Sequence, residues 1–314
     1  MRLKLPRLIH LLAGFTALVL VLLLTFAPAA ANAETGQPVD SALFWSVSRD
    51  GRQAGYLLGT IHSEDPRVLD FSDGFLDRLR SNEVFAMEMV PDAVTLERLG
   101  GYMKYPPGQS LEAVLGSERF HALESALSAY KVPADFIRMM KPWAAMMTLS
   151  TPPPDTGFFM DLSLSLRASG SGLEVVGLET LEEQLSFLEN MPMPMQIDLL
   201  DQAIAESDHV VEVHGQMVNA YLQNNLPALQ ALSDEQLGEV GEDAKTYFIE
   251  LGIHARNRRM ADSLIQQLEQ NTVFAAVGAL HLPGEQGLIN ILRRHGFVLD
   301  PLPLPFATSP VKAP

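Results

Sequence analysis

Cysteine is absent from all 314 residues of the chain. Its absence excludes thiol catalysis, disulfide bonds, cysteine-ligated zinc and a lipidated N-terminal cysteine. A domain of this length can rely on its own hydrophobic core instead. The chain also has no Gly-x-Ser-x-Gly elbow, no His-Glu-x-x-His motif and no Walker-type or dinucleotide-binding glycine pattern. The familiar hydrolase and nucleotide-binding classes are therefore unsupported.

Basic residues are also few, with 22 Lys and Arg against 38 Asp and Glu and a formal net charge of −16. Because residues 1–33 contain three basic and no acidic residues, their removal would take the charge from −16 to −19. So negative a surface repels phosphate groups, which argues against nucleic acid and against anionic lipid as partners. With 47% hydrophobic and 19% charged residues, the composition is that of a globular protein.

The N-terminal segment has the three parts of a secretory signal. Arg2, Lys4 and Arg7 precede an uncharged, mostly apolar run over 11–26, and Ala31-Asn32-Ala33 matches an A-x-A cleavage site. We expect a signal peptide at 1–33, cleavage after Ala33, and a mature domain at 34–314 in the periplasm or secreted, with no membrane association. The alternative is an uncleaved N-terminal anchor, because the run approaches a membrane-spanning length.

Apolar strand patterns lie toward both ends of the chain, and helical patterns fill the middle. Asp50-Gly51 predicts a hairpin between the first two strands. Ser110 is a predicted helix N-cap, and Thr180 with Glu183 three residues later predicts a capping box. The predicted strands cover 42–47, 56–61, 83–90, 173–176 (short and buried), 272–277 and 297–299. The predicted helices cover 75–79, 133–149, 194–223, 234–239, 243–270 and 285–295. We predict an α/β fold whose central mixed sheet is formed from N- and C-terminal strand units, with the mainly helical insertion 91–270 packed as a cap.

Two Gly-x-x-His motifs directly follow apolar strands, Gly59-Thr60-Ile61-His62 and Gly278-Ala279-Leu280-His281. Ligands gather at strand ends in α/β sheets, so neighbouring strands would bring both imidazoles to one rim. Two imidazoles and a carboxylate form a common ligand set for a divalent metal with an open position. Glu88, in the otherwise apolar stretch 84–90, is the candidate carboxylate, since burying its charge requires compensation. The alternative is that Glu88 points outward or forms a structural ion pair.

Three further polar residues are candidates for the same site. Arg256 and Asn257 lie on a predicted helix, where they can bind a substrate carbonyl or an oxyanion; the alternative is a solvated basic helix face. Glu179 follows the strand predicted at 173–176, and its alternative role is that of a carboxylate at a helix N-terminus. Asp161, in an apolar stretch, is either buried and paired or on an exposed helical face. For His121, His209, His214 and His295 we expect surface or packing roles.

Taken together, these motifs resemble the TraB/GumN (TraB/PrgY) family. The resemblance is carried by Phe44-Trp45, the segments 56–62 and 177–184, Glu88, Arg256-Asn257 with Met260, and the segment 277–284. The family is similar to the Tiki metal-dependent proteases and, in fold, to the erythromycin esterase and haem-binding ChaN group. The resemblance implies that His62, Glu88 and His281 form the metal and catalytic core and that Arg256 and Asn257 line it.

The function expected is that of an exported, metal-dependent peptidase or related hydrolase acting on a peptide or small-molecule substrate. Manganese, cobalt and zinc are the metals considered, and Glu88 or Glu179 would act as general base. One alternative is a metal-free, esterase-like hydrolase. Another is a non-catalytic protein that binds haem or another small ligand through the same histidines. The sequence carries no signal for an oligomeric state.

Overall fold

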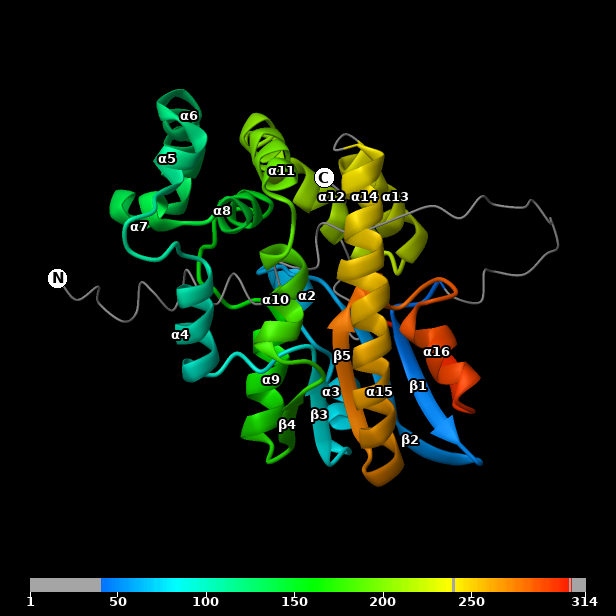
Figure 1. The fold of residues 1–314 in the computed structure, drawn as a ribbon. Coiled ribbons are helices and arrows are strands. Elements are labelled where there is room, and N and C mark those ends of the chain that lie inside the picture. Colours follow the sequence, from blue (N-terminus) through cyan, green and yellow to red (C-terminus); the bar gives the residue numbers. More distant parts are fainter. Residues whose placement is uncertain (1–40, 239–240, 305, 307–314) are drawn as a thin grey trace, which may run out of the picture.

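A six-stranded mixed sheet forms the centre of the protein (Figure 1). The computed structural model describes residues 41–238, 241–304 and 306, so the predicted signal peptide at 1–33 lies outside it. The strands are β1 (Phe44–Arg49), β2 (Arg52–Thr60), β3 (Val84–Met87), β4 (Glu174–Gly177), β5 (Val273–Gly278) and β6 (Val298–Leu302). Their order in the sheet is β4-β3-β5-β2-β1-β6. The first four in this order are parallel, whereas β1 is antiparallel to both β2 and β6. The predicted mixed sheet is therefore confirmed.

A tight hairpin connects β1 and β2, as predicted. The two connecting residues, Asp50 and Gly51, both have positive φ angles of 51° and 72°. Two successive positive φ values define the type I′ turn, whose twist matches that of the flanking strands. Arg49 consequently pairs with Arg52 at the closed end of the hairpin.

Strand β5, from the C-terminal part of the chain, lies between β2 and β3 from the N-terminal part. All six of its residues are buried, as expected for a strand covered on both faces of a parallel sheet. Thr60 pairs with Gly278, and Gly59 pairs with Val277. The two Gly-x-x-His motifs thus leave adjacent parallel strands side by side, offset by one residue.

Helices cover the sheet and gather at the end toward which β5 points (Figure 1). Before β5 they are α2 (Pro66–Leu69), α3 (Asp73–Arg80), α4 (Ala93–Tyr102), α5 (Leu111–Leu115), α6 (Ser117–Ala126), η2 (Leu127–Tyr130), α7 (Ala134–Met139), α8 (Pro142–Leu149), α9 (Met160–Gly170), α10 (Leu181–Glu189), α11 (Met193–Ala205), α12 (Val210–Leu222), α13 (Leu226–Gly238), α14 (Glu242–Tyr247), the π-helical turn η3 (Phe248–His254) and α15 (Ala255–Gln270). The 3₁₀ turn η4 (Ala279–His281) and α16 (Leu288–Arg294) follow β5. Among the described residues, no helix is long and apolar enough to cross a bilayer.

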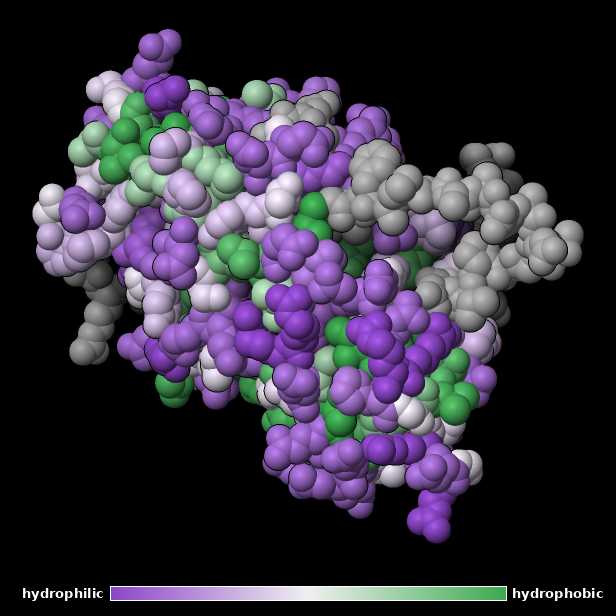
Figure 2. Space-filling view, turned by 45° about the vertical axis from the view of Figure 1, so that its right-hand side comes forward, coloured by the Kyte–Doolittle hydropathy of each residue, from purple (hydrophilic) through white to green (hydrophobic). Residues whose placement is uncertain are grey.

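The buried apolar side chains form two clusters. One, the sheet cluster, contains the sheet residues together with side chains from α2, α3, α9, α12, α13, α15 and α16. The other, which we call the cap cluster, draws on α4 to α8, α10, α11, α14 and η3. On the face drawn in Figure 2, hydrophilic side chains predominate and the hydrophobic ones form small, separate patches.

Several predicted elements differ from those observed. The helix predicted at 133–149 is broken into α7 and α8, because Lys141 precedes a proline and adopts an extended conformation. The helix predicted at 194–223 is likewise two helices, α11 and α12, and the one predicted at 234–239 is the end of the longer α13. The segment 243–270 is helical but passes through η3. Strand β4 is a partly exposed edge strand rather than a buried one, with Glu174 and Gly177 exposed.

Candidate functional site

A group of buried polar residues lies where the two apolar clusters meet. Glu88 follows β3 between Met87 of the sheet cluster and Met89 of the cap cluster. Glu179 similarly lies between Leu178 of the sheet cluster and Leu181 of the cap cluster. The parallel strands β2, β3, β4 and β5 all end here, the position at which ligands bind in α/β sheets.

The guanidinium of Arg256 joins the two glutamates. Its Nη2 donates to Glu88 Oε2 at 2.6 Å and also to Glu179 Oε1, while its Nε donates to Glu179 Oε1 at 2.8 Å. Arg256 and Asn257 are fully buried, whereas the next residue, Arg258, is exposed. The first turn of α15 is therefore an inward-facing polar surface and not the solvated basic face considered as the alternative.

The two carboxylates differ in their other contacts. Glu88 also accepts hydrogen bonds from the backbone N–H of Gly278 at 2.9 Å and from Gln184 Nε2 at 3.3 Å. Burial by itself raises the pKa of Glu88, but Arg256 and the Gly278 N–H outweigh it and hold that pKa below its usual range. Burial raises the pKa of Glu179, because Arg256 offsets only part of the desolvation and the Oε2 atom has no hydrogen-bond partner among the described residues. Of the two carboxyl groups, Glu88 is the more firmly ionised.

The imidazole of His281 is held in one tautomer. Its Nδ1 lies 2.6 Å from Asn257 Oδ1, and Asn257 Nδ2 in turn donates to the carbonyl of Gln286 at 2.8 Å. Since an amide oxygen only accepts hydrogen bonds, Nδ1 carries the hydrogen and Nε2 presents a lone pair. Burial lowers the pKa of His281 to about 3, so the ring is neutral at physiological pH. Asn257 thus acts as a positioning residue for His281.

The loop that carries His62 makes a ring stack and hydrogen bonds with the segment before α9. The ring of His62 stacks on Phe159, with centroids 3.6 Å apart and planes inclined by 18°. Glu64 accepts backbone hydrogen bonds from Asp155, Thr156 and Gly157. These contacts hold His62 at the end of β2, 4% exposed. Neither Phe159 nor Glu64 was predicted as part of the site, because their partners lie almost 100 residues away in the sequence.

The lone pair of His281 Nε2 faces Glu88, with Nε2 and Oε1 3.8 Å apart. This separation is too long for a hydrogen bond. An imidazole nitrogen and a carboxylate oxygen that face each other are suitable ligands for one cation. However, no group of three or more His, Cys, Asp and Glu residues in the described part of the chain is arranged to hold a metal ion. Of the predicted ligands His62, Glu88 and His281, the structure therefore places Glu88 and His281 3.8 Å apart, and the three do not form such a group.

Asp161, at the start of α9, is a third carboxylate at these strand ends. Its Oδ1 accepts a hydrogen bond of 2.6 Å from the hydroxyl of Thr60, inside the first Gly-x-x-His motif. Burial, opposed by the Thr60 hydrogen bond and assisted by the nearby charge of Glu88, raises the pKa of Asp161 to about 7. The structure thus shows Asp161 partly buried, with Oδ2 shielded from solvent and Oδ1 paired with a hydroxyl, rather than on an exposed face. Tyr221 of α12 fastens the same motif by donating to the carbonyl of Gly59 at 2.6 Å.

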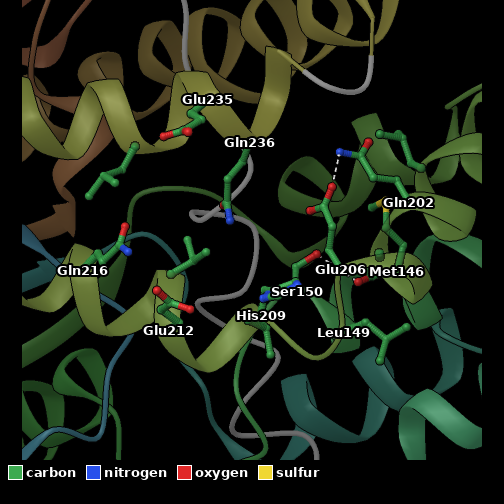
Figure 3. Close-up of a pocket in the computed structure, with 15 residues that line it drawn as sticks. Met146, Leu149, Ser150, Gln202, Glu206, His209, Glu212, Gln216, Glu235 and Gln236 are labelled. Atoms are coloured by element: carbon green, nitrogen blue, oxygen red, sulfur yellow. Dashed lines mark hydrogen bonds between the residues drawn. The ribbon is translucent and has the colours of Figure 1, made fainter.

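A separate cavity of about 390 Å³ lies between α8, α11, α12 and α13 (Figure 3). Its polar lining includes Glu206, His209, Glu212 and Glu235. None of the predicted site residues lines it. The strand-end residues instead pack directly against one another.

The chain belongs to the TraB/PrgY/gumN family, whose model matches residues 43–301. Among curated proteins it is 23% identical to "Metalloprotease TIKI1" of Danio rerio, over 88% of this chain and 66% of that protein. It is 24% identical to "Metalloprotease TIKI2" of Xenopus tropicalis, over 84% and 60%, and 22% identical to "Metalloprotease TIKI1" of Homo sapiens, over 88% and 65%. The chain therefore spans slightly less than two thirds of the length of these relatives. No solved structure matches it significantly.

Proposed function

We propose that this protein is an exported hydrolase that cleaves peptide bonds at the strand-end site and uses a divalent metal ion. The observation that carries the proposal is the meeting of Glu88, His281 and Arg256 at the ends of parallel strands, with the Nε2 lone pair of His281 facing Glu88 Oε1 at 3.8 Å. Metalloprotease names among the relatives support the peptide substrate. A small-molecule ester or amide is the other substrate class expected from the sequence.

Glu88 and His281 would act on the attacking water. Both Glu88 Oε1 and His281 Nε2 are acceptors, and a water placed between them can donate to each. Because Glu88 is ionised and the imidazole is neutral, the carboxylate takes the proton while His281 orients the water. Asn257 keeps Nε2 in the accepting state. Glu179, the other base suggested by the sequence, holds Arg256 through two donors instead.

Arg256 would stabilise the charge that develops on the substrate. Its Nη1 is buried and has no hydrogen-bond partner among the described residues. A positioned donor that faces a developing oxyanion contributes a factor of about 10²–10³ in kcat. The two glutamates hold the guanidinium fixed while Nη1 remains available to donate.

The metal ion would be held by His62, Glu88 and His281, in which case the lone pair of His281 Nε2 would go to the ion rather than to the water. Glu88 Oε1 and His281 Nε2 already lie 3.8 Å apart. When bound, such an ion polarises the scissile carbonyl and lowers the pKa of a ligated water.

The proposal is tested with purified mature protein and a peptide library, with cleavage read by mass spectrometry. We expect cleavage by the wild-type protein, loss on chelation and recovery with one of manganese, cobalt or zinc. His281→Ala should lose both activity and metal content. The control is His121→Gln, whose side chain is 72% exposed and lies outside the site. Unchanged metal content in His281→Ala would refute the ligand assignment.

A metal-free hydrolase is the second candidate, favoured by the finding that no group of three or more ligand residues is assembled among the described residues. Cleavage that survives exhaustive chelation but is lost in Glu88→Gln would support it. Haem binding through the same histidines is the remaining alternative. A Soret band on haem titration that is lost in His62→Ala or His281→Ala would support it.

Export is the remaining part of the proposal, supported by the basic, apolar and A-x-A segments of residues 1–33. Expression of the full chain in a bacterial host, followed by N-terminal sequencing, should give a protein that begins at Glu34 in the periplasmic or secreted fraction. A protein that still begins at Met1 in the membrane fraction would instead indicate the uncleaved anchor.

A further inference from the structure

Three carboxylates lie at the ends of the parallel strands, and one of them has no cation beside it. Glu88 and Glu179 share the guanidinium of Arg256. Asp161 forms no ion pair among the described residues, and its Oδ1 has only the hydroxyl of Thr60. Its Oδ2 is shielded from solvent and has no hydrogen-bond partner in the described part of the chain. A shielded carboxylate without compensation is costly as an anion but not as a neutral acid.

Burial and the charge of Glu88 favour the neutral form of Asp161 and outweigh the hydrogen bonds that favour its anion. The titratable groups that act on it are Glu88, which follows β3, and Tyr221 of α12. Strand β4 and helix α2 also pack against α9, but neither supplies an ion-pair partner for Asp161. Within 41–238, 241–304 and 306, the hydroxyl of Thr60 is the only side chain that donates a hydrogen bond to Asp161 and so stabilises its anion.

We propose that Asp161 is the proton donor of this site, the acid that protonates the leaving group while Glu88 remains ionised. The inference rests on the hydrolase proposed above and adds a residue to its site. Two carboxyl groups whose environments favour opposite protonation states form the usual acid and base pair of such sites. Here Arg256 keeps one carboxyl group charged, whereas desolvation and the charge of Glu88 favour the protonated form of the other.

The proton balance of the step is simple. As the water oxygen bonds to the carbonyl carbon, Glu88 takes the proton of the water. When the carbon–nitrogen bond breaks, the proton of Asp161 passes to the leaving nitrogen, so the amine departs neutral. The proton on Glu88 then leaves to solvent and Asp161 regains one from solvent, which restores both groups.

A first test needs no substrate. Carbon-13 NMR of protein labelled at the Asp and Glu carboxyl groups should show one aspartate that titrates near pH 7, and Asp161→Asn should remove that signal. Asn keeps an oxygen that can accept from Thr60, so the hydrogen bond and the fold are retained. Thr60→Val, which removes the hydroxyl that favours the anion, should move the same titration to higher pH. Asp77→Asn, at a side chain that is 75% exposed, is the control and should leave the titration unchanged.

The second test is kinetic and uses the peptide that the library identifies. Asp161→Asn should lower kcat by about 10²–10⁴, because general acid catalysis contributes rate factors of this size. It should also remove the alkaline limb of the pH profile, the fall of kcat at alkaline pH, since that fall reports the loss of the proton from Asp161. Thr60→Val should shift that limb upward, a change that a purely structural role for Asp161 would not cause.

The possible outcomes separate the two proposals. An aspartate that titrates near pH 7, together with the loss of the alkaline limb in Asp161→Asn, supports the role of Asp161 as proton donor. Near wild-type kcat and an unchanged profile in Asp161→Asn overturn it, as does an Asp161 that titrates near pH 4. If Asp161 titrates near pH 7 but the wild-type protein cleaves no substrate, the proposed hydrolase fails and the catalytic role of Asp161 fails with it.

Discussion

Replacing Arg256 by methionine tests whether the buried ion network holds the sheet and the cap together. The guanidinium is fully buried and donates three hydrogen bonds to two carboxylates. Methionine fills much of the same volume but supplies neither charge nor donors. Removing one partner of a buried ion pair costs about 3–5 kcal/mol, because an uncompensated charge is left behind. This is a large part of a typical unfolding free energy of about 5–15 kcal/mol.

The loss of unfolding free energy in Arg256→Met should be larger at high pH than at low pH. Without Arg256, burial raises the pKa values of Glu88 and Glu179 above those of the unfolded chain. A group with a raised folded pKa stabilises fully at low pH and loses that contribution as the pH rises through the folded pKa. The loss caused by Arg256→Met should therefore be largest at pH 8 and smaller at pH 5.

Urea unfolding followed by circular dichroism measures the effect. With a slope of about 3 kcal/mol per molar urea, the midpoint should fall by about 1–2 M at pH 8. Arg259→Met is the matched control: its side chain is 35% exposed and lies 4.0 Å from Glu179, so its loss should stay below about 1 kcal/mol. Adding Glu179→Gln to Arg256→Met should restore part of the loss, since it removes one uncompensated carboxyl group. A loss below about 1 kcal/mol in Arg256→Met, or one that does not change with pH, would refute the reasoning.

Two further substitutions test the contacts around the first motif. Gly59→Ala would place a methyl carbon 2.7 Å from Leu282 Cδ1 and should lower the unfolding free energy by about 1–3 kcal/mol. Gly101→Ala, with nothing within 4 Å, should be neutral or stabilising in the same urea assay. Tyr221→Phe should cost about 1–3 kcal/mol, because the buried carbonyl of Gly59 loses its 2.6 Å donor; a change of under 0.3 kcal/mol would mean that this hydrogen bond contributes nothing net.

Local signals predicted much of the fold. Asp50 and Gly51 adopt the two positive φ angles that the tight turn requires. Thr180 and Glu183 form the predicted capping box within one helical turn. The Gly-x-x-His motifs were recognisable because each directly follows an apolar strand. The segment Lys141-Pro142-Trp143 predicts a kink, and the structure has a full break there, because the residue before a proline is driven to an extended conformation.

Partners distant in the sequence could not be predicted. Arg256 meets glutamates 77 and 168 residues away, and the helix pattern alone did not decide whether it faces solvent or core. Asp161 was left open for the same reason, because its hydroxyl partner lies 101 residues earlier on another element. Both assignments depend on which strands are neighbours, and this is decided only when the sheet forms.

The placement of β5 has a consequence for the order in which the chain folds. During synthesis β2 and β3 emerge early, but each needs β5 as its neighbour at the centre of the sheet, and β5 begins at Val273, long after Thr60 and Met87. Until then both strands have an unsatisfied apolar edge, the kind of edge that promotes aggregation. A chain truncated before Val273 should therefore require a chaperone to stay dispersed, and it would also lack His281. The joining of the two parts of the sheet by β5 and the completion of the site are thus the same late event in folding.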